Sequence, residues 1–217
     1  MNDQHRPADV AVGSTRCDSP RSETVSRLRS SQPLVLGLVW VTLVALAVAG
    51  RAWQPAAHVT PLAAVSLAAG AFFPGTLLAV SVPVMSLAIG NLFLPPYGSL
   101  LEAVVIYAAF AWPVLLGRAG LLGSIGRETR WPALIGGALA SSLVFYFATN
   151  ITFWLTTDMY PKSAAGLLAC LTAALPFHRW MPVGDLAWTL GIFGVFQAAT
   201  TASDAFAARR LAPRRSS

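Results

Sequence analysis

Few side chains in this sequence could do chemistry, and they stand inside or beside long apolar segments. Asn91, Glu102, Asn150 and Asp185 each interrupt a run that is otherwise almost free of polar groups. Burying such a group costs free energy unless it finds a partner, so each one needs an explanation. We therefore select eight candidate ligand-binding residues, which are these four and the nearby polar or aromatic residues His58, Thr60, Trp154 and Trp188.

Helical spacing indicates which candidates share a face. In a helix, Tyr146, Asn150 and Trp154 lie on one side, and Asp185 and Trp188 lie on another. Aromatic side chains with a few polar groups are typical of small-molecule binding sites. The same residues also have a structural interpretation, in which the amides bond neighbouring backbone carbonyls and the tryptophans mark helix ends.

The residue types favour binding over catalysis. The sequence has three His and two Cys, with no nucleophile elbow, no His-Glu-x-x-His pattern and no phosphate-binding glycine loop. No His and Cys cluster has metal-ligand spacing. We therefore expect no enzyme activity, no metal site and no cofactor.

The composition of the chain indicates the environment in which these residues lie. The chain is 55% hydrophobic and only 11% charged, whereas soluble domains average about 25% charged residues. The net charge of +6 comes from Lys and Arg residues that flank apolar runs. Basic residues at helix ends orient membrane proteins, whereas a nucleic-acid surface needs them on one folded face. The sequence thus predicts an integral membrane protein in contact with lipid and not with nucleic acid.

The apolar segments predict an all-α, polytopic bundle of six transmembrane helices. Residues 1–32 are expected to form a disordered basic cytoplasmic tail, residues 33–206 the transmembrane domain and residues 207–217 a second basic cytoplasmic tail. The expected spans are Leu34–Gly50, Pro61–Phe73, Thr76–Leu94, Leu100–Leu116, Pro132–Leu155 and Val183–Phe206. The first span could instead be a cleaved signal peptide, although the polar region before it is long for one.

Ser163–Leu175 is apolar but short, so it is either a seventh span or an outer interfacial helix. With six spans, twelve basic residues face the cytoplasm and three (Arg51, Lys162 and Arg179) face outward. With seven spans the C-terminal arginines move outside, which weakens the positive-inside bias. The sequence therefore favours six spans, a short outer interfacial helix over Ser163–Leu175, and both termini in the cytoplasm at the inner (plasma) membrane.

Several segments resemble an uncharacterised family of bacterial membrane proteins. The similar segments are His58–Val65 with Gly70–Phe73, Thr149–Trp154, Tyr160–Pro161, and Ala173–Phe177 through Gly184–Leu186. That family is similar in turn to the substrate-binding S components of energy-coupling-factor vitamin transporters. Gly90-Asn91 departs from their pattern, in which an acidic residue is expected after a small one.

The resemblance implies a six-helix protein that binds a small vitamin-like solute from the outer side, with or without transporting it. Its expected partners are the lipid bilayer, the solute and an energising transporter module. The alternative is a structural or assembly subunit of a membrane complex, because small residues recur four apart in several segments, as in Ala64 and Ala68.

Overall fold

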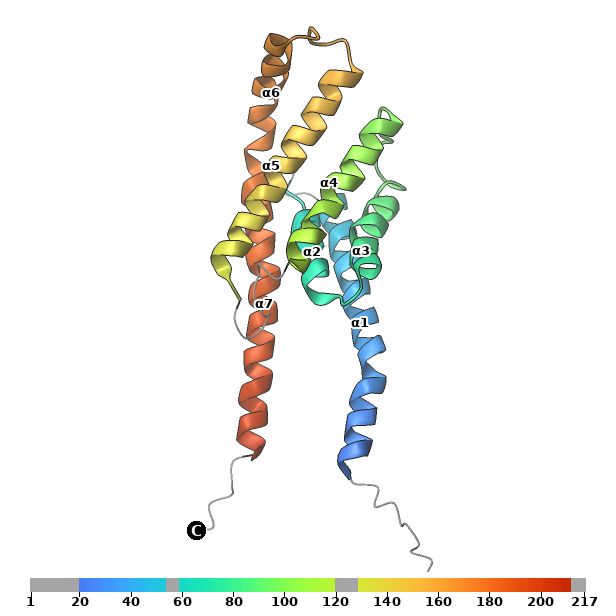
Figure 1. Cartoon of the computed structure of the whole chain (residues 1–217), viewed down its shortest axis with the longest axis vertical. Coiled ribbons are helices and arrows are strands. Elements are labelled where there is room, and N and C mark those ends of the chain that lie inside the picture. Colours follow the sequence, from blue (N-terminus) through green and yellow to red (C-terminus); the bar gives the residue numbers. More distant parts are fainter. Residues whose placement is uncertain (1–19, 54–58, 120–128, 212–217) are drawn as a thin grey trace, which may run out of the picture. The chain divides into compact units, whose positions relative to one another are not determined.

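A computed structural model describes residues 20–53, 59–119 and 129–211, and places side chains within residues 33–206 of these ranges. The described residues form seven helices and no strands (Figure 1). The helices are α1 (Pro20–Ala52), α2 (Leu62–Phe72), α3 (Thr76–Gly90), α4 (Leu100–Arg118), α5 (Trp131–Thr156), α6 (Ala164–His178) and α7 (Trp180–Leu211). The chain divides into two units, Met1–Gly37 and Leu38–Ser217, and the helix bundle belongs to the second.

The all-helical prediction is confirmed, and several helix boundaries differ from the expected ones; α7, for example, ends at Leu211, inside the segment expected to be the second tail. Helix α1 begins at Pro20, inside the segment expected to be a disordered tail, and proline is well tolerated in the first turn of a helix. Helix α3 ends at Gly90 and not at Leu94, because the two following prolines disfavour helix before them. Helix α7 begins at Trp180, earlier than Val183, so Pro182 falls in its first turn.

The helices of the second unit alternate in direction. Trp40 Nε1 donates to Ser81 Oγ at 2.9 Å and Arg51 Nη2 to Asn91 Oδ1 at 3.4 Å, so α1 and α3 run in parallel. Arg118 at the end of α4 donates to the Phe73 carbonyl just after α2, at 3.0 Å, so α2 and α4 end together. We call these two levels of the bundle the Arg51 end and the Arg118 end.

Helix α5 runs back toward the Arg51 end, and α6 and α7 together form its antiparallel partner. Tyr146 Oη donates to the Leu171 carbonyl of α6, at 2.5 Å. One turn earlier in α5, Ser142 Oγ donates to Asp185 Oδ2 of α7 at 2.5 Å. The partners therefore progress steadily from α6 into α7 as α5 is followed toward its start.

The α6–α7 connection differs from the expected outer helix followed by a separate span. Helix α6 lies along α5, and only Arg179 separates it from α7. Arg179 keeps helical dihedral angles, with φ −52° and ψ −30°. Pro176 and Pro182 remove backbone donors on either side, so the helix breaks without reversing. The short segment is therefore an extension of α7.

Helix α2 forms the centre of the bundle and packs against α3, α4, α5 and α7. Every residue from Leu62 to Gly70 is buried. A Cβ at Gly70 would stand 2.1 Å from the Val114 carbonyl oxygen, and one at Gly117 would stand 2.3 Å from that of Leu67. These glycines allow the α2 and α4 backbones to touch, as small residues do in membrane helix pairs.

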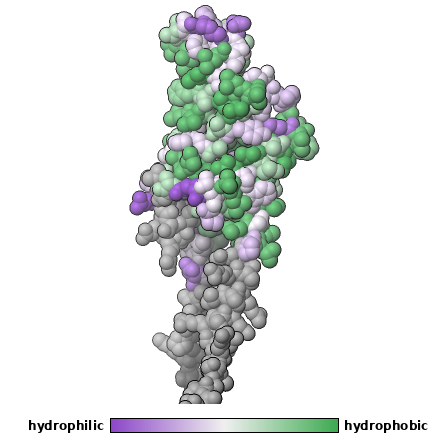
Figure 2. Space-filling model, turned by 45° about the vertical axis from the view of Figure 1, so that its right-hand side comes forward, coloured by the Kyte–Doolittle hydropathy of each residue, from purple (hydrophilic) through white to green (hydrophobic). Residues whose placement is uncertain are grey.

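The exterior of the second unit is largely apolar. Green hydrophobic side chains cover much of the face in Figure 2, and hydrophilic residues gather at its upper tip, near the α5–α6 connection. Three of the described helices are long and apolar enough to cross a membrane, namely Pro33–Ala52, Leu100–Arg118 and Trp131–Thr156. Helices α2, α3 and α6 are apolar but shorter. Large apolar residues exposed on helices this apolar indicate a membrane protein.

Candidate functional site

Two adjoining cavities lie in the part of the second unit toward the Arg51 end. The α5–α6 cavity has a volume of about 190 Å³ and is lined by Phe145, Tyr146, Thr149, Asn150, Ala174, Phe177, His178 and Met181. The Arg51 cavity has a volume of about 140 Å³ and is lined by Arg51, Thr60, Leu62, Tyr97, Ile106, Phe110, Phe145 and Met181. Phe145 and Met181 line both, so the cavities are two lobes separated by shared side chains.

The short central helix explains the position of the Arg51 cavity. Helix α2 has 11 residues and α4 has 19, and the two helices end at the same level. Because α2 is the shorter helix, it does not reach the Arg51 end of the bundle, which therefore has no central helix. Thr60 and Leu62, at the beginning of α2, line this cavity. The remaining walls come from α1, α4, α5, α7 and the α3–α4 connection, through Arg51, Ile106, Phe110, Phe145, Met181 and Tyr97.

A polar network around Asn91 borders the Arg51 cavity. Asn91 Oδ1 accepts from Tyr97 Oη at 3.1 Å and from Arg51 Nη2 at 3.4 Å, and its Nδ2 donates to Tyr107 Oη at 3.4 Å. Arg51 and Tyr97 line the cavity, and Asn91 does not. The predicted candidate Asn91 therefore holds two lining residues in position from α3.

Glu102 lies in the first turn of helix α4. Its backbone N–H donates to Ser99 Oγ at 3.1 Å, and its Oε2 accepts from the Gly98 N–H at 2.9 Å. This arrangement is close to a capping box, in which a Ser and a Glu satisfy the unpaired donors of a helix start. Glu102 lines neither cavity.

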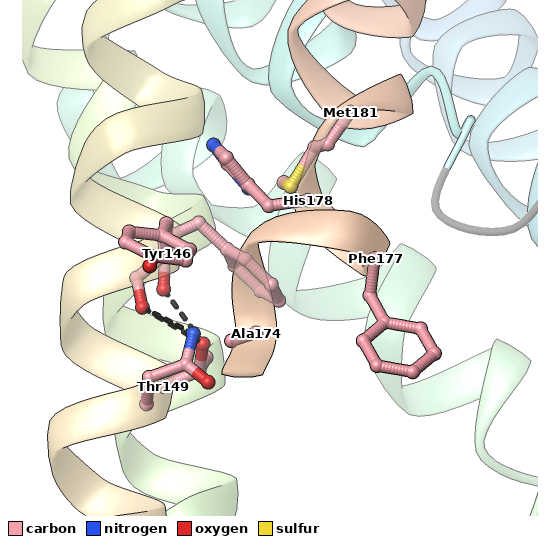
Figure 3. Close-up of a pocket in the computed structure, with 8 residues that line it drawn as sticks. Tyr146, Thr149, Ala174, Phe177, His178 and Met181 are labelled. Carbon is pink, nitrogen blue, oxygen red and sulfur yellow. Dashed lines mark hydrogen bonds between the residues drawn. The ribbon is translucent and has the colours of Figure 1, made fainter. Parts of the chain in front are cut away.

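Asn150 lies in the wall of the α5–α6 cavity. Its Nδ2 donates to the Tyr146 carbonyl one turn earlier, at 2.7 Å. Its Oδ1 accepts no hydrogen bond from the described residues. Figure 3 shows this wall of α5 facing the α6 side chains, with the Tyr146 ring beside His178; the two ring centroids are 4.5 Å apart.

Asp185 is buried between α5 and α7, away from both cavities. It is 1% exposed, and Ser142 Oγ donates to its carboxylate at 2.5 Å. Its neighbour one turn later, Thr189, is fully buried, and the Thr189 hydroxyl has no hydrogen-bond partner in the described part of the chain. The structure thus brings Asp185 to a helix contact and does not place it beside Asn150 in one cavity.

The remaining candidates are dispersed. Trp154 Nε1 donates to the Pro161 carbonyl at 2.9 Å, and the Lys162 ammonium lies 5.7 Å from the centroid of its ring, so Trp154 fastens the α5–α6 connection. Trp188 lines neither cavity. Thr60 lines the Arg51 cavity and is 8% exposed. His58 lies outside the described residues.

Several lining residues were not among the sequence candidates. Arg51 was assigned only to topology, because an arginine directly after an apolar run ordinarily reaches to the membrane interface and carries no separate signal for a site. Phe145, Met181 and Ile106 carry no signal in the sequence, because apolar residues fill every segment around them. Across the described residues, no three His, Cys, Asp or Glu side chains are grouped so that they could hold a metal ion.

Comparison with known proteins gives one match. No curated protein and no solved structure matches this chain. Residues 31–208 match the model of a family of unknown function, DUF6580. The match includes all of α2 to α6, both cavities and most of α1 and α7. The chain is therefore a member of the DUF6580 family of proteins of unknown function.

Proposed function

We propose that this protein binds a small solute in the two cavities and takes it up from the outer side of the membrane. The observation that carries the proposal is the pair of adjoining cavities, of about 190 and 140 Å³, with shared walls at Phe145 and Met181. Taken together they reach the lower end of the range of roughly 300–1,000 Å³ that is usual for small-molecule sites. Aromatic walls with a few polar groups are the ordinary composition of such sites.

The proposed topology has six passes with both termini in the cytoplasm. It is supported by the alternation of α1, α2, α3, α4 and α5, and by the single direction of α6 and α7. It is also supported by the basic residues, which flank the Arg118 end and the termini. In this topology the Arg51 end and both cavities face outward. An S-component-like role, with a separate energising module, is the transport mechanism that we propose.

A cavity-filling substitution tests the proposed function. Ala174 lines the α5–α6 cavity, whereas its neighbour Ala173 is exposed on α6. We expect Ala174→Trp to fill the cavity and Ala173→Trp to leave it open. The protein is purified in mild detergent, and the small molecules that co-purify are identified by mass spectrometry.

The expected result is one small molecule present with the wild type and Ala173→Trp, and at least about tenfold depleted with Ala174→Trp. A molecule that is retained equally by both variants would place the site elsewhere. If no molecule is enriched over a mock purification, the proposed function is wrong.

The alternative function, a subunit of a membrane complex, is favoured by one observation. Gly136 on α5 and Gly191 and Gly194 on α7 have no atom within 4 Å of the position of an added Cβ. Such sites let another helix approach closely in lipid. In this case a second protein, and no small molecule, would co-purify in fixed proportion.

A further inference from the structure

We propose that the Arg51 cavity binds the carboxylate of a small monocarboxylic acid, whose apolar body lies against Phe145 and Met181. This inference rests on the proposed function and assigns a chemical class to its solute. Three features of the cavity carry it: the guanidinium in its wall, the helix start at its floor, and the lack of acidic side chains among the lining residues that the structure describes.

The guanidinium of Arg51 matches a carboxylate in charge and in hydrogen-bond geometry. Its planar set of donors matches the two oxygens of a carboxylate, which is why arginine recognises such groups specifically. The Asn91 side chain holds one end of it, at 3.4 Å from Nη2. Because Asn91 is neutral, this contact orients the positive charge without cancelling it.

The floor of the cavity is the beginning of α2. Pro61 is the N-cap residue, and among the residues that the structure describes no side chain caps this helix. The first turn of α2 contains no acidic residue. The first N–H groups of a helix have no partner within it and carry partial positive charge, so this end attracts an anion.

Thr60 adds a hydroxyl donor beside the same floor. It is 8% exposed and lines the cavity, and its hydroxyl bonds none of the described side chains or backbone groups. Tyr97 also lines the cavity, but its hydroxyl already donates to Asn91. A bound carboxylate would therefore meet Arg51, Thr60 and the start of α2.

The other walls limit the ligand to one charge. The other described lining residues are all apolar, namely Leu62, Ile106, Phe110, Phe145 and Met181. A second charged group, as in a dicarboxylate or a phosphate dianion, would lie against these side chains at a large desolvation cost. A cationic ligand would face Arg51 with no acidic residue in the lining.

The test uses the full chain in detergent and a series of ω-phenyl carboxylic acids, from phenylacetate to 6-phenylhexanoate, with their primary amides. Each amide keeps the size and shape of its acid but lacks the charge. The measurements are the midpoint of thermal unfolding and the Kd from titration of the intrinsic tryptophan fluorescence. We expect at least one acid to bind roughly tenfold or more tightly than its amide.

Two variants then remove this preference in different ways. Arg51→Gln deletes the charge. Asn91→Asp keeps Arg51 but puts a carboxylate oxygen where Asn91 Oδ1 now accepts from it, so the pair becomes neutral. We expect both variants to bind acid and amide equally. The control is Arg179→Gln, because Arg179 is exposed, stacks on the Trp180 ring and lines neither cavity; this variant should keep the preference.

Equal binding of acids and amides by the wild type overturns the inference and leaves the cavity as a solute site. A preference that survives Asn91→Asp overturns it as well, even if Arg51→Gln fails to fold. If no acid in the series binds, the inference is wrong, whereas the proposed function is judged separately by the molecule that co-purifies and by the Ala174→Trp variant.

Discussion

At the scale of single residues, the polar groups within the apolar segments of this protein divide into two kinds. Asn91 and Asp185 are committed to protein groups, since Asn91 bonds Arg51, Tyr97 and Tyr107 and Asp185 bonds Ser142. Asn150 keeps its Oδ1 available at a cavity wall. Polarity within an apolar segment therefore does not identify a ligand contact by itself; the partner of each polar atom does.

This division predicts opposite results for Asp185→Asn and Asn150→Leu. Asparagine keeps an oxygen that can accept from Ser142 and removes a buried acid, so the thermal midpoint of Asp185→Asn should be unchanged or higher. Solute binding should also persist, because Asp185 lines neither cavity. Asn150→Leu removes the free cavity acceptor and should weaken binding of the co-purified solute about tenfold, with a nearly unchanged thermal midpoint. Loss of binding in Asp185→Asn at unchanged stability would contradict the assignment.

At the scale of elements, the contact between α2 and α4 sets the space for the Arg51 cavity. Both backbones approach at Gly70 and Gly117, and Arg118 fastens the α2–α3 turn through the Phe73 and Pro74 carbonyls, at 3.0 and 3.1 Å. This contact holds the short α2 at the Arg118 end, which leaves room above it for the Arg51 cavity. A shift of α2 along α4 would close that space.

The matched pair Gly117→Ala and Gly136→Ala tests this contact. A Cβ at position 117 would meet the Leu67 carbonyl oxygen at 2.3 Å, whereas at position 136 it would meet nothing within 4 Å. We expect Gly117→Ala to lower the free energy of unfolding by about 1–3 kcal/mol through overpacking. Gly136→Ala should be neutral or stabilising by up to about 1 kcal/mol, because alanine favours helix. Thermal unfolding in detergent measures both, and equal midpoints would show that the α2–α4 approach is not tight.

At the scale of the whole molecule, the membrane topology depends on whether α6 and α7 make one pass or two. They follow α5 as one antiparallel partner, from Tyr146 with Leu171 to Ser142 with Asp185. The chain does not reverse at Arg179, so α6 and α7 count as one pass. The chain therefore reverses direction an odd number of times between α1 and α7. In the six-pass topology that we propose, the two ends of the membrane domain therefore emerge on the same side.

This topology predicts a cytoplasmic C-terminus. A green fluorescent protein fused after Ser217 should fluoresce, and alkaline phosphatase fused at the same place should be inactive, because each reporter works on only one side of the membrane. As a positive control for export, alkaline phosphatase inserted at Asp158, in the α5–α6 connection, should be active. An active phosphatase at Ser217 would restore the seven-span topology.

The sequence alone determined the helical class and most helix positions, because these follow from local properties. Apolar runs require helices, and breaks at Pro74-Gly75 and Pro95-Pro96 follow from proline and glycine chemistry. The end of α3 and the start of α7 lie a few residues from their predicted positions, because both helix capping and nearby prolines influence where a helix ends or begins. The choice of Asn150 and Thr60 as site residues also came from sequence, since a polar group in an apolar run is visible locally.

Only the tertiary structure decided which of those residues share a cavity. Arg51 and Tyr97 lie far apart in sequence and meet through Asn91, and Phe145 and Met181 come from different helices to form the shared wall. The sequence selected both Asp185 and Asn150 as ligand-binding candidates, but in the structure Asp185 bonds Ser142 and lines neither cavity. The physical reason is that a cavity is the space left by packed helices, and the short α2 creates that space through contacts at Gly70 and Gly117 that no local pattern encodes.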